Sequence, residues 1–214
     1  IGSGLVGSEM CIRDRHCTHI KGNCFYEGGL TVRFKIPIMI IKKKGGFCVQ
    51  VEHLSSDYRV SLLSKKDVPK IYQLYQGNPL YFEHMKAQPT PENTEEDLIV
   101  LPPGKQKQDK FFVGFWEKEK LIAVLDLIAA YPNAHTAFIG LFMVAKEEQG
   151  KQTGSKIIYQ LLKHLKQEGF STARLAYVKT NPQSEHFWKK NGFILTGEEK
   201  DQGDYTVVLM EKML

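Results

Sequence analysis

Long hydrophobic runs and cysteine are what this 214-residue sequence has least of. Its longest apolar run, 121–130, is broken by Asp126 and falls well short of the roughly 18 apolar residues of a membrane span. All four cysteines lie in the first quarter of the chain, which a disulfide-stapled secreted fold would not show. We therefore expect a soluble, cytoplasmic protein with no membrane partner.

A strong charge of one sign is also missing. Twenty-nine Lys and Arg residues face 24 Asp and Glu residues, a net charge of +5 that is spread along the chain. Nucleic-acid-binding domains concentrate more positive charge than this, so no nucleic-acid partner is expected, whereas an anionic small ligand suits the balance. The 42% hydrophobic and 25% charged content is that of an ordinary globular domain.

The N-terminal region lacks periodic structure. Residues 1–38 show no helical or strand period and no signal-peptide pattern, so we interpret them as a poorly structured tail or scar that precedes a plausible start at Met39. Residues 39–57 form an extension of uncertain structure. The spacing of the cysteines and histidines matches no paired zinc knuckle, so no metal is expected. A zinc-binding N-terminal module is the alternative, with the ligands Cys11, Cys17, Cys24, His16 and His19.

From Tyr58 onward the pattern predicts one α/β domain, 58–214, with a mixed sheet of the α+β kind. Strands are predicted at 58–63, 111–116, 121–130, 136–144, 173–180, 193–196 and 205–210. Helices are predicted at 68–75, 91–101 and 182–190, with a long one that carries the apolar stripe 157–165 and stops at Gly169. The aromatic segment 79–90 forms either a lid or a packed helix.

The junction at 149–155, between the strand that ends at Val144 and the long helix, carries the strongest functional signal. The first N–H groups of a helix lack partners and carry partial positive charge, so they can bind phosphate oxygens. A Walker loop would need glycine in place of Ala145 and serine or threonine in place of Gln152. The glycines of a dinucleotide fingerprint are missing as well.

Two motifs here resemble those of the GNAT superfamily of acetyl-CoA-dependent N-acetyltransferases. Its pyrophosphate loop has Gln or Arg, two residues, Gly, one residue, then Gly or Ala. Gln149 and Gly154 match this pattern, and Gln152 replaces the middle glycine. The second motif is a strand that ends in Asn181, followed by an aromatic helix and Gly-Phe at 192–193.

The resemblance covers 58–214 and implies a GNAT-like fold, a splayed central sheet flanked by helices. It implies direct transfer of an acetyl group from acetyl-CoA to a primary amine, on a small molecule or a peptide. No metal is implied, and both a monomer and a homodimer remain open.

The resemblance also implies which residues bind acetyl-CoA. The backbone of the strand end would pair with the pantetheine arm through Phe142, Met143 and Val144. Loop N–H groups would hold the pyrophosphate, those of Gln149, Gly150, Lys151, Gln152, Gly154 and Ser155. Asn181 would reach the arm from the neighbouring strand. Lys151 and Lys156 either add charge near the phosphates or are solvated.

Trp188 departs from the family pattern, because many members have a tyrosine there that protonates the departing CoA thiolate. An indole N–H does not release its proton near pH 7. Either the thiolate, with a thiol pKa near ~8.5, takes a proton from water or from a hydroxyl such as that of Ser184 or Tyr205, or the protein is a non-catalytic acyl-CoA-binding or sensing module. The absence of cysteine near the loop favours direct transfer.

The acceptor amine must lose a proton, since an alkyl amine has a pKa of about 10.4. Asp126 is the candidate base, because a carboxylate inside an apolar strand is costly to bury unless it has a partner or a function. The alternative is a structural aspartate paired with the backbone or a lysine. Tyr131 either lines the acceptor pocket or begins a turn with Pro132, and Glu185 and His186 are interpreted as exposed helix residues.

Overall fold

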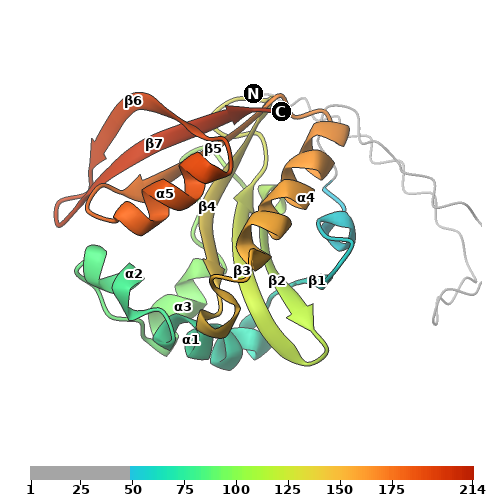
Figure 1. Cartoon of the computed structure of the whole chain (residues 1–214), viewed down its shortest axis with the longest axis vertical. Coiled ribbons are helices and arrows are strands. Elements are labelled where there is room, and N and C mark those ends of the chain that lie inside the picture. The colour runs from blue at the N-terminus through green and yellow to red at the C-terminus, as the bar shows by residue number, and fades with distance from the viewer. Residues whose placement is uncertain (1–48) are drawn as a thin grey trace, which may run out of the picture. The chain divides into compact units, whose positions relative to one another are not determined.

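A seven-stranded mixed sheet organises the part of the chain that the computed structural model describes, residues 49–214 (Figure 1). The strand order is β1-β2-β3-β4-β5-β7-β6, and only β4 and β5 run parallel. The predicted tail and the residues of the zinc alternative lie outside the described residues. No helix within 49–214 is both long and apolar enough to cross a membrane.

The elements follow the predicted order, to which the structure adds short 3-10 turns and helix α2. The strands are β1 Arg59–Leu62, β2 Lys110–Glu117, β3 Lys120–Ile128, β4 Thr136–Val144, β5 Thr172–Val178, β6 Ile194–Asp201 and β7 Thr206–Met213. The helices are α1 Val68–Gln76, α2 Pro79–His84, α3 Pro91–Asp97, α4 Thr153–Gln167 and α5 Pro182–Lys190. The 3-10 turns are η1 Val51–His53, η2 Lys65–Asp67, η3 Lys107–Asp109 and η4 Lys146–Glu148.

Most predicted elements differ from the observed ones by one to three residues at an end, and α3 and β6 differ by more. Helix α3 ends at Asp97 rather than at 101, because the β-branched Ile99 and Val100 that follow are poor helix formers and are exposed. Strand β6 continues to Asp201 although Gly197 and the four charged residues that follow it are exposed. It is an edge strand held by β7 alone, so burial imposes no alternation that the sequence could reveal.

Helices cover both faces of the sheet. The stripe of α4 that the periodicity predicts packs on one face, where Ile157, Ile158 and Leu161 are fully buried. Helices α1 and α2 cover the other face through a second cluster that includes Ile71 and Phe82. Segment 79–90 is therefore a packed helix at its start, as one of the two predicted alternatives states.

The first described residues belong to this core. Val49, Val51 and Leu54 are buried in the same cluster as α4, and all three lie in 39–57, the extension for which no structure is predicted. The turn η1 is too short to give a readable period, which is why the pattern places the start of the domain at Tyr58.

The sheet splays between its two parallel strands. β4 and β5 pair only over Thr136 to Ile139 and Thr172 to Leu175, and beyond these residues their ends, 140–144 and 176–178, separate. Gly140 is the extra residue of a bulge against β3, because Leu127 faces Ile139 and Asp126 already faces Leu141. Figure 1 shows β4 and β5 diverging, with β6 and β7 following β5.

Candidate active site

The separated strand ends enclose a cleft of about 200 Å³. Strands β4 and β5 form its walls, α2 and α5 contribute residues at its sides, and β7 with the turn before it adds two more. The lining residues are Tyr81, Met85, Ile139, Gly140, Leu141, Phe142, Leu175, Ala176, Tyr177, Val178, Asn181, Ser184, Trp188, Tyr205 and Val207. The cleft brings together two segments that the sequence singles out separately, the end of β4 and the helix after Asn181.

The loop between β4 and α4 has the conformation of an anion-binding nest. Gly150 and Gln152 are both left-handed, with φ of 77° and 66°, and Lys151 between them is not. Such alternation turns successive N–H groups toward one point, and the first N–H groups of α4 add further donors because they have no intrahelical acceptor. For Gln152 the left-handed conformation costs about 1–2 kcal/mol, whereas glycine adopts it freely.

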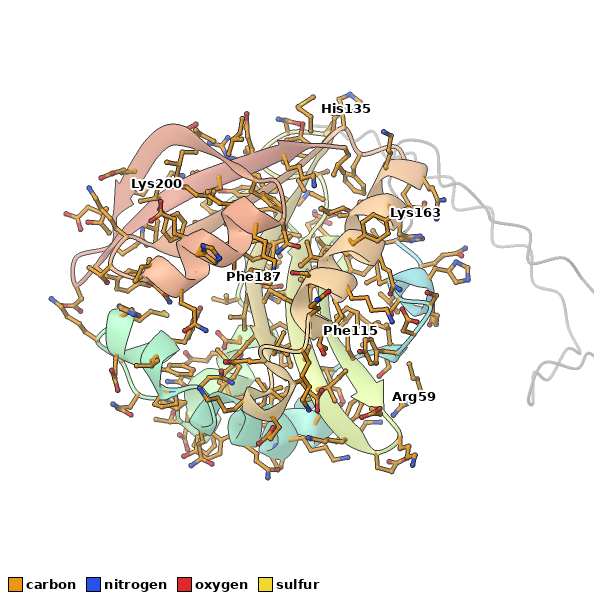
Figure 2. The ribbon with its side chains drawn as sticks, in the orientation of Figure 1. Arg59, Phe115, His135, Lys163, Phe187 and Lys200 are labelled. Carbon is orange, nitrogen blue, oxygen red and sulfur yellow. The ribbon has the colours of Figure 1, made fainter. Side chains whose placement is uncertain are left out.

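Gly154 holds the start of α4 close to β4 and α5. A Cβ atom at this position would lie 3.1 Å from Cε2 of Phe187 and 3.3 Å from Cγ2 of Val144. Figure 2 shows Phe187 on α5 beside α4. A larger residue would push α4 away from its neighbours, so glycine is required here for packing rather than for its backbone freedom.

Some of the backbone groups that the resemblance assigns to CoA already have hydrogen-bond partners in the protein. The N–H of Gln149 donates to the carbonyl of Lys146 at 3.3 Å, which leaves the loop N–H groups from Gly150 onward for an anion. On β4, the N–H of Ala145 donates to Ile122 of β3. Because the direction of the backbone N–H and C=O groups alternates along a strand, those of Met143 also point toward β3. Only the N–H and C=O groups of Phe142 and Val144 point toward the open edge of β4.

The two lysines near the loop pair with carboxylates. Lys151 Nζ lies 3.5 Å from Glu148, and Lys156 Nζ lies 3.2 Å from Asp57, with both lysine side chains more than half exposed. These contacts favour the solvated alternative for both residues. Exposed pairs of this kind contribute at most about 1 kcal/mol.

Asn181 is buried at the N-cap of α5 and lines the cleft. Its Oδ1 accepts a hydrogen bond from the N–H of Ser184 at 2.9 Å, which stabilises the first turn of α5. No described residue accepts from its Nδ2. The amide therefore has one side committed to the helix and a free donor for a ligand in the cleft.

Trp188 is part of an aromatic cluster rather than of a polar one. It is buried, and its ring centroid lies 5.0 Å from that of Phe187, 5.1 Å from that of Phe193 and 6.1 Å from that of Phe142. The two hydroxyl residues proposed from the sequence, Ser184 and Tyr205, both line the cleft. The structure thus gives the cleft hydroxyl groups that do not depend on residue 188.

Asp126 forms a buried ion pair with a residue that the sequence pattern does not reveal. Lys110 Nζ lies 2.8 Å from its Oδ2, and the two side chains are 4% and 13% exposed for Lys110 and Asp126. Burial raises the pKa of Asp126 to about 6 and Lys110 opposes that rise, while no described residue donates to Oδ1.

Asp126 lies against the wall of the cleft. A Cβ atom on Gly140, a lining residue, would be 2.7 Å from Oδ2 of Asp126, so only glycine leaves room for the carboxylate at the bulge. The ion pair with Lys110 agrees with the alternative in which Asp126 is a structural residue paired with a lysine. Its position beside the cleft is the one that a catalytic base would require.

The sequence pattern does not predict a role for three further polar residues near Asp126 and the cleft, Tyr75, Asp97 and Tyr81. The hydroxyl of Tyr75 donates to Asp97 at 2.7 Å, and burial raises the pKa of Asp97. Tyr81 lines the cleft, and burial together with the charge of Asp97 raises the pKa of its hydroxyl. Tyr81 therefore stays protonated at neutral pH and can donate a hydrogen bond. The aromatic content of 79–90 is the only sequence signal for it.

Tyr131 lies outside the residues that line the cleft. Its N–H donates to the carbonyl of Thr136, and its ring packs edge-on against Phe138 at 5.4 Å. It follows the end of β3, which is beside the beginning of β4, whereas the cleft opens beyond Ile139. Its position agrees with the alternative in which Tyr131 begins a turn with Pro132.

Comparison with known proteins agrees with this geometry. A family model described as the acetyltransferase (GNAT) family matches residues 69–193. An acetyltransferase from Thermus thermophilus has a similar structure, with a TM-score of 0.62 at 21% identity over 76% of this chain and 99% of that chain. The PaiA N-acetyltransferase of Thermoplasma acidophilum, in complex with coenzyme A, gives 0.55 at 21% identity over 73% and 98%.

An acetyltransferase from Salmonella typhimurium that modifies the N-terminal serine of ribosomal protein L7/L12 gives a TM-score of 0.60 at 17% identity, over 75% of this chain and 97% of that chain. No curated protein sequence matches the chain.

The family model, and not the geometry of the cleft alone, defines the class of protein as an acetyltransferase. The family match covers more than half of the sequence, and the chain belongs to the GNAT N-acetyltransferase family. Enzymes of this family use acetyl-CoA to acetylate amines, including amines of proteins.

Proposed function

We propose that this protein transfers an acetyl group from acetyl-CoA directly to a primary amine on a peptide or a small molecule. The observation that carries the proposal is the cleft itself. It has a buried carboxylate beneath its wall at Gly140, and a nest of N–H donors at 150–152 follows the end of β4, the strand that forms one of its walls. These are the two functions that such a transfer needs, an anchor for the donor and an acceptor for the amine proton.

The residues present fit acetyl-CoA. The N–H groups of 150–155 suit a pyrophosphate. The open edge of β4 suits the amide-containing arm at Phe142 and at the N–H of Val144, whose carbonyl already accepts from Gln149 and Asn78. The Nδ2 of Asn181 supplies a further donor. Acetyl-CoA supplies the reactive thioester, whose thiol departs after transfer. Held along the splay, the arm would direct this end into the part of the cleft next to Asp126.

Asp126 acts as the base in this proposal, directly or through a water molecule. With a pKa of about 6 it is ionised at neutral pH and still accepts a proton more readily than an ordinary carboxylate. Lys110 keeps it from being fully neutralised by burial, since the ammonium group stabilises the ionised form. The pair therefore tunes a base rather than only filling the core.

The proton for the departing thiolate comes from a hydroxyl of the cleft or from water. Trp188 cannot provide it, whereas Tyr205 lines the cleft and carries a hydroxyl group. A thiol with a pKa near ~8.5 is a tolerable leaving group, so modest assistance is sufficient. No cysteine lies within 49–214, and so transfer proceeds without a thiol shuttle.

The experiment has two stages. In the first, acetyl-CoA at ~100 times its dissociation constant should stabilise the protein by about 2.7 kcal/mol, measured as a rise in melting temperature. The absence of any rise would refute the proposal. In the second, thiol release is followed with a panel of peptides with free N-termini, lysine peptides and small amines.

The second candidate function, a non-catalytic acyl-CoA-binding module, is favoured by one observation, the buried indole of Trp188 at the position of the usual proton donor. Stabilisation by acetyl-CoA without thiol release on any amine, and without transfer of a radiolabelled acetyl group to a cell extract, would favour this candidate. Thiol release that depends on one class of amine would exclude it and would name the substrate.

A further inference from the structure

We propose that Gln149 is a positioning residue that, through Asn78, couples the pyrophosphate loop to helix α2, so that an occupied loop fixes the side of the cleft lined by Tyr81 and Met85, which we assign to the acceptor. This inference rests on the proposed function. The two residues are far apart in the sequence. Gln149 stands at the start of the loop, Asn78 lies between α1 and α2, and their side chains are hydrogen-bonded to each other.

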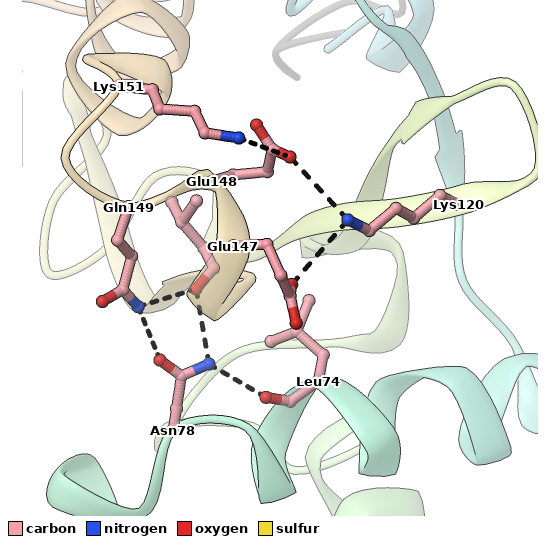
Figure 3. A network of polar contacts seen from close by, with 8 residues as sticks. Leu74, Asn78, Lys120, Glu147, Glu148, Gln149 and Lys151 are labelled. Carbon is pink, nitrogen blue, oxygen red and sulfur yellow. Dashed lines mark hydrogen bonds and ion pairs between the residues drawn. The ribbon is translucent and has the colours of Figure 1, made fainter.

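The contact is a closed set of amide hydrogen bonds, drawn in Figure 3. The Nε2 of Gln149 donates to Oδ1 of Asn78 at 2.7 Å and to the carbonyl of Val144 at 3.0 Å. The Nδ2 of Asn78 donates to the carbonyl of Leu74 at 2.9 Å and to that of Val144 at 3.3 Å. The side chains of Asn78 and Gln149 thus connect the loop, the end of β4 and α1, and all their N–H donors are hydrogen-bonded.

Asn78 occupies the N-cap position of α2, yet its side chain makes no capping bond to that helix. An asparagine at an N-cap ordinarily accepts a hydrogen bond from the helix that follows. Here the side chain instead bonds backward to α1 and across to Val144 and Gln149. The start of α2 is therefore positioned by the loop and the strand rather than by its own cap.

Helix α2 has six residues, and it carries Tyr81 and, just after its end, Met85, both of which line the cleft. A helix so short is not stable by itself, so its place depends on its contacts. Phe82 anchors it in the core against Tyr75, and His84 at its far end bonds to Oγ1 of Thr180 at 3.1 Å. The contact through Asn78 is its polar attachment at the near end.

Gln149 is placed to transmit the state of the loop. Its own N–H is bonded to Lys146, so it does not contact the anion, but it directly precedes Gly150, where the nest begins. An anion bound to the nest restricts the main chain of the loop. The side chain of Gln149 is then held in place, and with it the start of α2.

Hydrogen exchange with two ligands tests this coupling. ADP carries a pyrophosphate but no pantetheine arm, so it can occupy the loop without touching Tyr81 or Met85. In the wild-type protein, ADP and CoA should both slow exchange at 150–155, and ADP should also slow exchange at 80–85, by about threefold or more, the effect expected when one hydrogen bond is made more persistent.

In Gln149→Met, which keeps the size of the side chain and removes its donors, ADP should still protect 150–155 but should no longer protect 80–85. Gln76→Met is the matched control. It replaces an exposed glutamine at the end of α1 whose side chain makes no hydrogen bond to a described residue. This variant should show the same protection by ADP as the wild type.

The reciprocal exchange Asn78→Gln with Gln149→Asn keeps both amides and the total length between the two backbones, and it should restore protection of α2. It also keeps the test decisive if Gln149→Met does not fold. Once an amine is identified, Gln149→Met should raise KM for the amine several-fold more than KM for acetyl-CoA.

The outcomes separate the two proposals. Protection of 150–155 without protection of 80–85 in the wild-type protein would overturn the coupling and leave the proposed function intact. Equal protection of 80–85 by ADP in wild type and Gln149→Met would overturn the coupling as well. If neither ADP nor CoA protects 150–155, the proposed function fails and the coupling fails with it.

Discussion

Replacement of Asp126 by asparagine tests its proposed catalytic role and its structural role by separate measurements. Asn cannot accept a proton from the amine, so we expect Asp126→Asn to lower kcat by about 10² to 10⁴, the usual contribution of a positioned base. The dissociation constant of CoA should not change, because the loop at 150–155 and Asn181 are untouched. The same substitution leaves Lys110 as a buried charge without its partner.

The cost in stability follows from that burial. Removal of one partner of a buried ion pair costs about 3–5 kcal/mol. We expect the lower end, because burial already disfavours the ionised carboxylate, as its raised pKa shows. For a domain of this size about 3 kcal/mol corresponds to a fall in melting temperature of roughly 6–12 °C.

The double variant Asp126→Asn with Lys110→Met removes the unpaired charge. It should recover most of the lost melting temperature, because an apolar side chain of similar length replaces the ammonium group in a site that is 4% exposed. Its kcat should stay as low as that of the single variant. Stability and rate are then measured on a folded protein that lacks only the base and its partner.

Melting temperature, CoA titration and thiol release together decide the outcome. A double variant with a rate within about threefold of the wild type would refute the role of Asp126 as the base, since a positioned base contributes far more than this. A single variant with an unchanged melting temperature would refute the energetic coupling of Asp126 to Lys110.

The remaining predictions concern pH and the loop. In wild type, kcat/KM should rise as pH increases through about 6, where Asp126 loses its proton, and Lys110→Met should move this limb to higher pH because the ammonium group lowers the pKa of Asp126. The same group binds more protons in the folded than in the unfolded state between its ordinary pKa of 3.8 and about 6, so its contribution to the free energy of unfolding should fall as pH rises through that interval, which urea titrations at each pH would detect. Gln152→Gly removes a strained left-handed side chain and should leave CoA affinity unchanged or improved while it raises the free energy of unfolding by up to about 1 kcal/mol, measured by urea denaturation. Gly154→Leu forces a side chain against Phe187 and should cost about 1–3 kcal/mol of stability, with a weaker affinity for CoA by calorimetry; an unchanged affinity would show that the start of α4 does not form the binding loop.

Local patterns determined the elements on which the site is built. Strand β4 and helix α5 have the predicted bounds, because the apolar run before the loop and the Asn-Pro start of α5 are properties of neighbouring residues. The loop from Gln149 to Gly154 was recognisable for the same reason. A left-handed position and a helix start are set by a few consecutive residues, and the sequence displays these directly.

Only the tertiary structure decided what those elements meet. Lys110 lies 16 positions from Asp126 on another strand, and Asn78 lies 71 positions from Gln149, so no local period announces either pair. The pairing of Asp126 with Lys110 depends on the register of β2 against β3, and the room for the carboxylate depends on the bulge at Gly140. Register and splay result from contacts among distant segments. The sequence therefore determined the loop at 149–155, and the folded sheet decided which residues line the cleft.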